Sequence, residues 1–240
     1  MDWLIPDWPA PQHVRACVTT RSTGESVAPY ASFNLGVHVG DNLEQVQRNR
    51  SYLAQVLQCQ PTWLDQVHGN RVVTADARQT LSADASVSRS VGLACCIMSA
   101  DCLPVLFTDQ AGSCVAAAHA GWRSLAAGVL ENTVAHMQVA PQHILAWLGP
   151  AIGAEVFEVG GEVREVFMQQ HPITEQAFVP SQNPGRWLAD IYQLARIRLA
   201  ACGVHAVYGG GFCTLTDPRF YSYRREPVSG RFASLVWITQ

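Results

Sequence analysis

Lysine is absent from this chain, so all 16 basic residues are arginines, set against 19 acidic residues. Without lysine the chain has neither an amine for Schiff-base chemistry nor the lysine of a phosphate-binding P-loop. The formal net charge is -3 and the isoelectric point is about 6.2, so there is no excess of positive charge for a phosphate backbone. The composition therefore excludes two common catalytic devices and argues against nucleic acid as a partner.

Long hydrophobic runs are missing as well. The most apolar window, residues 91–107, is interrupted by Asp101 and Pro104 and is shorter than the roughly 20 residues that a membrane helix needs. The first residues lack the basic and apolar segments of a secretory signal. We therefore expect a cytoplasmic protein without a membrane partner.

Cysteine pairs of the C-x-x-C type do not occur among the eight cysteines. This spacing disfavours a structural zinc ribbon and a thioredoxin-type redox site. In a reducing compartment we expect the cysteines to be free thiols.

The chain does have enough apolar residues, 48% of 240, to bury a substantial core. Strand-like and helix-like segments alternate along its whole length without an evident repeat or low-complexity tract. This pattern predicts an α/β fold: a single layered domain over residues 1–240 with mixed sheets flanked by helices. Strands are expected over 14–20, 71–75, 92–98, 104–108, 113–119, 143–148, 205–208 and 232–238.

Helices are expected where apolar residues recur at helical spacing. The first covers 42–58 after a segment that resembles a capping box, and the second is expected to be capped by Ser124. Two more are expected over 160–170 and 187–202, the last ending at Gly203. The apolar stripes expected on the first two helices are Leu43, Val46, Leu53 and Leu57, and Ala126, Leu130, Val134 and Met137.

A β-hairpin is predicted over residues 99–122, with its turn at Asp109–Gly112. A turn centred on the middle of those four residues would put Cys102 directly opposite His119. Side chains opposed in this way can share a metal ion or a thiol–imidazole hydrogen bond. A bulge at Pro104 would shift this register.

A further histidine, His68, lies in a turn-like segment before the strand at 71–75. His68, Cys102 and His119 would leave a tetrahedral zinc ion one open position for an acidified water, as in a catalytic zinc site. Two other interpretations stay open. Cys102 and His119 could form a thiolate–imidazolium couple for nucleophilic catalysis, or all three could be ordinary packed residues.

Several motifs together resemble the YfiH-like laccase-domain family over nearly the whole chain. They are S-F-N-L-G-V-H-V-G-D at 32–41, N-R at 49–50, Q-V-H-G at 66–69, A-D-C-L-P-V at 100–105, H-A-G-W-R at 119–123, L-G-P-A-I-G at 148–153 and Y-S-Y-R-R-E at 221–226. The resemblance implies a layered α/β domain related to cysteine-hydrolase folds. It also implies that His68, Cys102 and His119 are metal ligands.

That family has been described as polyphenol oxidases, as a peptidoglycan editing factor and as zinc-dependent purine nucleoside phosphorylases. The resemblance therefore implies phosphorolysis of adenosine, inosine and methylthioadenosine together with adenosine deaminase activity, with a nucleoside and phosphate as partners. Zinc is the expected cofactor, and copper is possible. The alternatives are a Cys/His amide hydrolase in peptidoglycan editing, a copper-dependent polyphenol oxidase and a metal-stabilised binding module.

Four further residues are candidates near this site. Arg50 lies on the apolar face of the first helix and needs an anion, which would be phosphate, a substrate oxygen or a structural carboxylate. Arg123 is a second candidate for phosphate binding, or else a surface residue. His38 would contact the purine or have a structural role. Asp101 would orient a ligand, carry a proton or cap a strand end.

Overall fold

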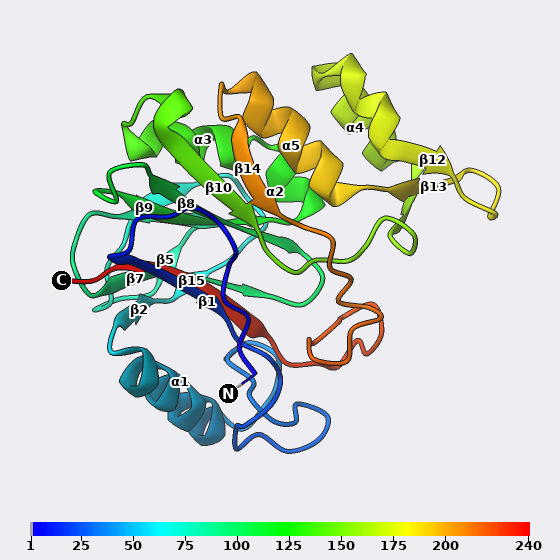
Figure 1. Cartoon of the computed structure of the whole chain (residues 1–240). Helices are drawn as coiled ribbons and strands as arrows, with labels where there is room; N and C mark the ends of the chain where they lie inside the picture. Colours follow the sequence, from blue (N-terminus) through cyan, green and yellow to red (C-terminus); the bar gives the residue numbers. More distant parts are fainter. Residues whose placement is uncertain (1) are drawn as a thin grey trace.

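The computed structural model describes residues 2–240, which form a mixed α/β fold in four layers (Figure 1). Two sheets pack face to face in the middle, and helices cover the outer face of each. The four-stranded sheet has the order β1 (Val14–Val18), β15 (Phe232–Ile238), β7 (Leu93–Ser99) and β2 (Gln60–Thr62). The six-stranded sheet has the order β14 (Ala206–Gly209), β10 (Ile144–Leu148), β8 (Leu103–Asp109), β9 (Val115–Ala120), β6 (Ala85–Ser88) and β4 (Val72–Thr74).

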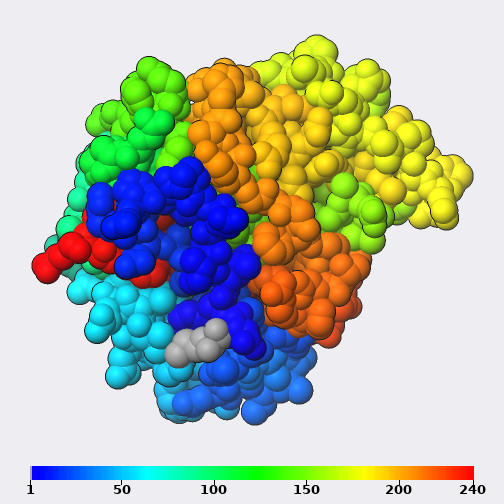
Figure 2. All heavy atoms as spheres, viewed as in Figure 1, coloured from blue at the N-terminus to red at the C-terminus, as the bar shows by residue number. Residues whose placement is uncertain are grey.

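The helices and the smaller sheets complete the fold. The helices are α1 (Leu43–Leu57), α2 (Trp122–Ala126), α3 (Val129–Met137), α4 (Gly161–Gln170) and α5 (Ile191–Ala201), with 3₁₀ turns at Pro141–His143 and Pro172–Ala177. A three-stranded sheet consists of β11 (Glu158–Gly160), β13 (Arg186–Ala189) and β12 (Phe178–Pro180), and β3 (Leu64–Asp65) pairs with β5 (Leu81–Ser82). In the space-filling view the yellow segment that contains α4, β12 and β13 projects from the body (Figure 2).

The inner strands β7, β8, β9, β10 and β15 are buried on both faces, which explains why they are apolar without a polar alternation. In β7, Ile97 faces the core between the sheets, and the neighbouring Cys96 faces the core under α1. On the far side of the six-stranded sheet, Val105 belongs to the core that α3 and α5 cover. None of the helices in residues 2–240 has the length and apolar character that crossing a bilayer requires.

Most predicted strands are confirmed within one or two residues, as are the helices at 42–58 and 160–170. All eight cysteines are free, as expected. The prediction of a helix over 187–202 is wrong at its start, because β13 occupies 186–189 and Asp190 caps a helix that begins at Ile191. The short strands β2, β3, β5, β6, β11 and β12 were not predicted, since two to four residues carry too little pattern.

The second predicted helix is two helices. Gly121, not Ser124, is the N-cap of α2, and Ser124 is buried inside that helix. Gly128 has a φ of 91°, in the left-handed region that favours glycine, and it separates α2 from α3. The predicted stripe is still buried, because both short helices turn the same face to the six-stranded sheet.

The predicted hairpin exists, but its predicted register is wrong by two residues. Pro104 pairs with His119, so Cys102 lies just before β8 and not opposite His119. The loop is longer than predicted because the Asp109 carboxylate accepts hydrogen bonds from Ser113 Oγ (2.8 Å) and Cys114 N (2.9 Å). As a result, the centre of the turn lies one residue later in the chain than the prediction assumed.

Helix α1 differs from its prediction in the residues that it buries. Val46, Asn49 and Leu53 are buried, whereas Leu43 is 57% exposed. The amide of Asn49 donates to Ser26 Oγ (3.1 Å) and to the carbonyl oxygen of Asn34 (2.9 Å), and its oxygen accepts from Glu25 N (2.9 Å). One polar side chain thus binds the 25–34 loop to the helix.

We predict that Asn49→Ala lowers the free energy of unfolding by about 2–4 kcal/mol, because it leaves several buried polar groups without partners. Urea unfolding measures this change. The matched control is Gln47→Ala, which lies on the exposed face of the same helix and should change stability by less than about 0.5 kcal/mol. Equal effects of the two substitutions would contradict the role given to Asn49.

Candidate active site

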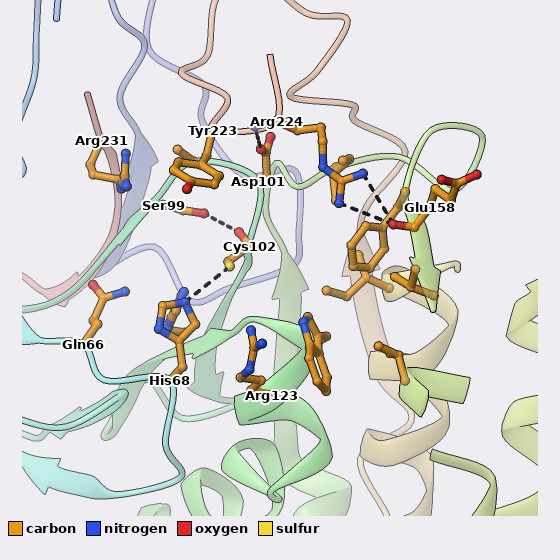
Figure 3. A pocket seen from close by; sticks show the side chains of 18 of the residues that line it. Gln66, His68, Ser99, Asp101, Cys102, Arg123, Glu158, Tyr223, Arg224 and Arg231 are labelled. Carbon is orange, nitrogen blue, oxygen red and sulfur yellow. Dashed lines mark hydrogen bonds between the residues drawn. The ribbon is translucent and has the colours of Figure 1, made fainter. Parts of the chain in front are cut away.

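Three side chains that are far apart in the sequence meet at one end of the central hairpin (Figure 3). His68 lies in the loop after β3, Cys102 in the turn between β7 and β8, and His119 in β9. Their nitrogen and sulfur ligand atoms all lie within 4.8 Å of one another. Cys102 Sγ is 4.0 Å from His68 Nε2, and the two imidazole rings have centroids 4.8 Å apart at 76°. The structure therefore brings together the three residues that the sequence proposed as ligands.

The fully buried carboxylate of Asp84 holds two of these ligands in place. Nδ1 of His119 donates to Asp84 Oδ1 (2.8 Å), which leaves Nε2 of that ring free to bind a metal ion. The same carboxylate accepts the backbone N–H groups of Val67 (3.2 Å), His68 (3.0 Å) and Gly69 (2.7 Å). Asp84 was not predicted from the sequence, because its segment carries no motif.

Two unusual backbone conformations direct the ligands. His68 has a φ of 59° and Asp101, directly before Cys102, has a φ of 91°. Positive φ costs energy in residues other than glycine and tends to occur at functional sites. Gly121 adds a close approach, because a Cβ on it would lie 2.8 Å from Cys102 Sγ.

The charges in the centre are strongly coupled. Burial opposes ionisation of Cys102, but the positive charge of His119 and hydrogen bonds from both histidines lower its pKa to about 6. Burial alone would lower the pKa of His119, whereas the Cys102 thiolate and the Asp84 carboxylate raise it to about 9. Around neutral pH the metal-free centre is therefore a thiolate beside an imidazolium.

These residues fit a metal ion. Two imidazole nitrogens and one thiolate are a donor set that zinc and copper both accept. A metal ion would replace the proton of His119 as the positive partner of the thiolate. The carboxylate behind His119 gives the arrangement in which a ligating histidine is oriented by its other ring nitrogen.

The three candidate ligands lie in a pocket of about 530 Å³. Beside the ligands its wall is polar and includes His38, Gln66, Tyr223 and Arg231. Another part of the wall is apolar and consists of Trp122, Ile152, Phe157, Val159, Val163 and Ile191. Arg123, Arg186 and Arg224 also line the pocket. A space of this size and mixed character suits a small molecule with one polar and one apolar part.

Of the other residues predicted from the sequence, His38 and Arg123 line the pocket and Arg50 does not. Arg50 stacks on Trp63, with its guanidinium carbon 3.9 Å from the ring centroid, and Nε donates to the carbonyl oxygen of Leu35 (2.9 Å). The expectation that Arg50 needs an anion is wrong, because an aromatic face and a carbonyl oxygen satisfy the guanidinium. Burial and the charges of Arg231 and Arg50 lower the pKa of His38.

Gln66 is a pocket residue, and the sequence singles it out only as part of the Q-V-H-G motif. Its amide donates to the carbonyl oxygen of Met98 (2.8 Å) and accepts from Met98 N (2.8 Å). This pair of hydrogen bonds continues the edge of β7 and fixes the loop that carries His68.

Asp101 joins the Cys102 turn to the C-terminal part of the chain. Its Oδ1 accepts from Thr214 Oγ1 (2.6 Å), and its Oδ2 accepts from the backbone N–H of Arg224 (2.7 Å). Both oxygens are therefore used to hold the segment that brings Tyr223 and Arg224 to the pocket.

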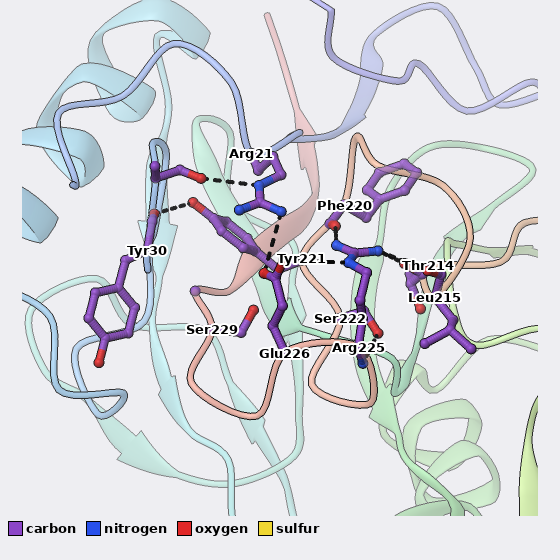
Figure 4. Close-up of polar contacts among 12 residues, drawn as sticks. Arg21, Tyr30, Thr214, Leu215, Phe220, Tyr221, Ser222, Arg225, Glu226 and Ser229 are labelled. Atoms are coloured by element: carbon purple, nitrogen blue, oxygen red, sulfur yellow. Dashed lines mark hydrogen bonds and ion pairs between the residues drawn. The ribbon is translucent and has the colours of Figure 1, made fainter. Parts of the chain in front are cut away.

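A second network holds that C-terminal segment from behind (Figure 4). Arg225 donates to the carbonyl oxygens of Thr214 (2.8 Å), Leu215 (3.0 Å) and Phe220 (2.6 Å). The Tyr221 hydroxyl donates to the carbonyl oxygen of Tyr30 (2.6 Å). These contacts turn a stretch without regular secondary structure into a fixed wall of the pocket.

We predict that Asp84→Asn weakens metal binding by about 10–100-fold, because an amide cannot accept every hydrogen bond that the carboxylate accepts. Competition with a chromogenic chelator measures the affinity. Asp76→Asn, a carboxylate paired with Arg78 outside the pocket, is the control and should bind metal like the wild type. An unchanged affinity in Asp84→Asn would show that this carboxylate does not organise the ligands.

In metal-free protein, we predict that alkylation of Cys102 follows an apparent pKa of about 6, because the thiolate is the reactive form. The lowered pKa of Cys102 stabilises the fold above the ordinary thiol pKa, and this contribution is lost as the pH falls through about 6. The raised pKa of His119 stabilises the fold below about 6.5, and this contribution is lost as the pH rises through about 9. The alkylation rate of Cys102, measured between about pH 5 and 9, tests the predicted pKa of this thiol. Cys102→Ser, which lacks the thiol, is the control. Alkylation with the pKa of an ordinary thiol would contradict the pairing.

Comparisons with known proteins agree over nearly the whole chain. The family described as multi-copper polyphenol oxidoreductase laccase matches residues 15–239. A purine nucleoside phosphorylase of Pseudomonas aeruginosa is 63% identical, with 98% of each chain covered, and the purine nucleoside phosphorylase YfiH of Escherichia coli is 52% identical, also with 98% of each covered.

Solved structures share the fold as well. A crystal structure of a Neisseria meningitidis protein has a TM-score of 0.97 at 49% identity and covers 100% of both chains. YlmD from Geobacillus stearothermophilus has a TM-score of 0.90 at 28% identity, covering 99% of this chain and 96% of that one. On both sequence and structure, this chain belongs to the YfiH-like laccase-domain family.

Proposed function

We propose that this protein is a zinc-dependent purine nucleoside enzyme. It would cleave adenosine, inosine and methylthioadenosine with phosphate and would also deaminate adenosine. The observation that carries the proposal is the His68–Cys102–His119 centre in a pocket whose volume suits a nucleoside. The names of the P. aeruginosa and E. coli relatives support the phosphorylase activity.

The centre would hold zinc through His68 Nε2, Cys102 Sγ and His119 Nε2, with residues 1–240 as one catalytic domain. When bound, zinc supplies a Lewis acid that polarises an oxygen atom and acidifies water. Asp84 keeps His119 in the orientation that presents Nε2. The eight free cysteines support a reducing location, and we propose the cytoplasm.

The pocket offers separate surroundings for the parts of the substrate. The apolar wall that includes Trp122 and Phe157 would cover the purine or the methylthio group, which both prefer to leave water. His38 and Arg123 would contact the polar atoms of the substrate, in keeping with their place in the pocket wall. Asp101 would act by holding the C-terminal segment, because both its oxygens already accept hydrogen bonds.

In phosphorolysis, a phosphate oxygen bonds to C1′ of the ribose while the bond from C1′ to the purine nitrogen breaks. The purine leaves with the electron pair of that bond and takes up a proton, and the sugar becomes ribose 1-phosphate. Arginine side chains in the pocket would hold the charge of the phosphate as its oxygen attacks.

We predict that the purified protein converts adenosine to adenine only when phosphate is present. It should convert adenosine to inosine without any need for phosphate. Cys102→Ala should lower both rates by about 100-fold or more, because it removes a ligand of the metal. Chromatography of the purines measures both products. Cys213→Ala, a partly buried cysteine outside the pocket wall, is the matched control and should keep both activities. Unchanged adenosine with metal-loaded wild type would refute the proposal.

A second candidate function is amide hydrolysis by Cys102 as the nucleophile, consistent with a role in peptidoglycan editing. One observation favours it: Cys102, His119 and Asp84 are arranged as nucleophile, base and orienting carboxylate. A thiolate needs no metal, so chelation would leave this activity intact, whereas it would abolish the nucleoside activities.

A copper-dependent polyphenol oxidase with a multicopper centre is less consistent with the number of candidate metal groups. Within residues 2–240, His68, Cys102 and His119 form the one group of three or more metal-ligating side chains close enough to share an ion. A multicopper centre needs several such groups. Metal analysis of the purified protein together with its visible absorption spectrum separates copper from zinc.

A further inference from the structure

Four of the described residues that line the pocket are arginines, and they differ in exposure. Arg123, Arg186 and Arg224 are exposed, whereas Arg231, directly before β15, is half-buried. Arg123 rests against the ring of Trp122, with its guanidinium carbon 4.4 Å from the centroid. Arg231 is therefore the pocket arginine whose charge is least screened by water.

The 34–36 loop is built around the aliphatic stem of Arg231. The backbone N–H of Arg231 donates to Asn34 Oδ1 (2.9 Å), and Gly36 N donates to the same oxygen (2.9 Å). A Cβ on Gly36 would lie 2.9 Å from Arg231 Cγ, so a larger residue there would displace the stem. The N-L-G part of the 32–41 motif thus has a physical role: it sets the direction of this arginine.

Some N–H groups of the Arg231 guanidinium have no hydrogen-bond acceptor in the described part of the chain. Nη1 donates to the carbonyl oxygens of Ser229 (2.9 Å) and Gly230 (2.9 Å). Nε and Nη2 have no partner among residues 2–240, and no carboxylate of that part of the chain forms an ion pair with Arg231. Figure 3 shows its guanidinium and the Tyr223 hydroxyl beside the same space above His68.

A guanidinium in these surroundings calls for an anion. Partial burial of a guanidinium is costly, and a nearby negative group offsets that cost. Cys102 and Asp101 lie close enough to act on the charge of Arg231, but neither accepts a hydrogen bond from it, and an oxyanion on the free N–H groups would add that contact. Two parallel N–H groups of a guanidinium match two oxygens of a phosphate in a bidentate contact. The site also lies beside the ligand centre, where a nucleophile has to be held for reaction.

We propose that Arg231 binds the inorganic phosphate that attacks the nucleoside, with Nε and Nη2 as the two donors. This inference rests on the proposed function, which it deepens by naming the phosphate ligand. Asn34 and Gly36 are positioning residues that act through Arg231.

The experiment compares wild type, Arg231→Lys and Arg231→Gln, each loaded with metal and checked by circular dichroism. We expect KM for phosphate in inosine cleavage to rise at least about tenfold in both variants, since Lys cannot make the bidentate contact. Deamination of adenosine without phosphate, measured in the same variants, should fall by a smaller factor than inosine cleavage at low phosphate, because deamination uses no phosphate. Arg48→Gln, an arginine in ion pairs on the outer helix α1, is the matched control and should leave both activities unchanged.

Binding without turnover separates this inference from the proposed function. Inorganic phosphate should raise the melting temperature of the wild type and not that of Arg231→Gln, and this result would support the subsite even if no nucleoside were cleaved. Wild-type KM for phosphate in both variants, or no stabilisation of the wild type by phosphate, would overturn it. Stabilisation by adenosine 5′-phosphate but not by inorganic phosphate would also overturn it, because the anion would then belong to a nucleotide.

Discussion

The contact between the buried Asp84 carboxylate and His119 is the interaction on which the candidate centre depends. The carboxylate accepts from the imidazole of a central strand and from three consecutive backbone N–H groups of the loop that carries His68. Without it, two ligands on separate elements would have no common support, and several buried donors would lack a partner. A single residue thus fixes the orientation of two of the three candidate ligands.

The frame around this contact comes from the two packed sheets. The central strands are buried on both faces, so a pocket can open only at their ends. At one such end, the turn with Cys102 lies beside the end of β9. The segment after β14 has no regular structure of its own, and Asp101 and Arg225 hold it as the remaining wall of the pocket. A rigid strand therefore carries His119, and loops tethered by hydrogen bonds carry the other two candidate ligands and much of the pocket wall.

Much of this could be predicted from the sequence, and the rest depends on contacts between distant segments. The alternation of strand-like and helix-like segments predicted the layers. The motifs named three residues that the fold does bring together, His68, Cys102 and His119. The hairpin register was wrong because the Asp109 carboxylate caps the turn, a contact with no periodic signal. Asp84 and Arg231 were missed for a related reason: the importance of each comes from groups that only the folded chain brings near. Arg50 was singled out correctly as unusual, but its partner is an aromatic ring.

X-ray absorption spectroscopy at the metal edge of the purified, active protein tests the central claim most directly, because it reports the identity of the metal and the atoms bound to it. We expect zinc with one sulfur and two imidazole nitrogen ligands and one further light atom, which completes a tetrahedron. Loss of the sulfur signal in Cys102→Ala would assign that ligand. A metal shell without sulfur, or activity that is kept after the metal has been fully removed, would contradict the account.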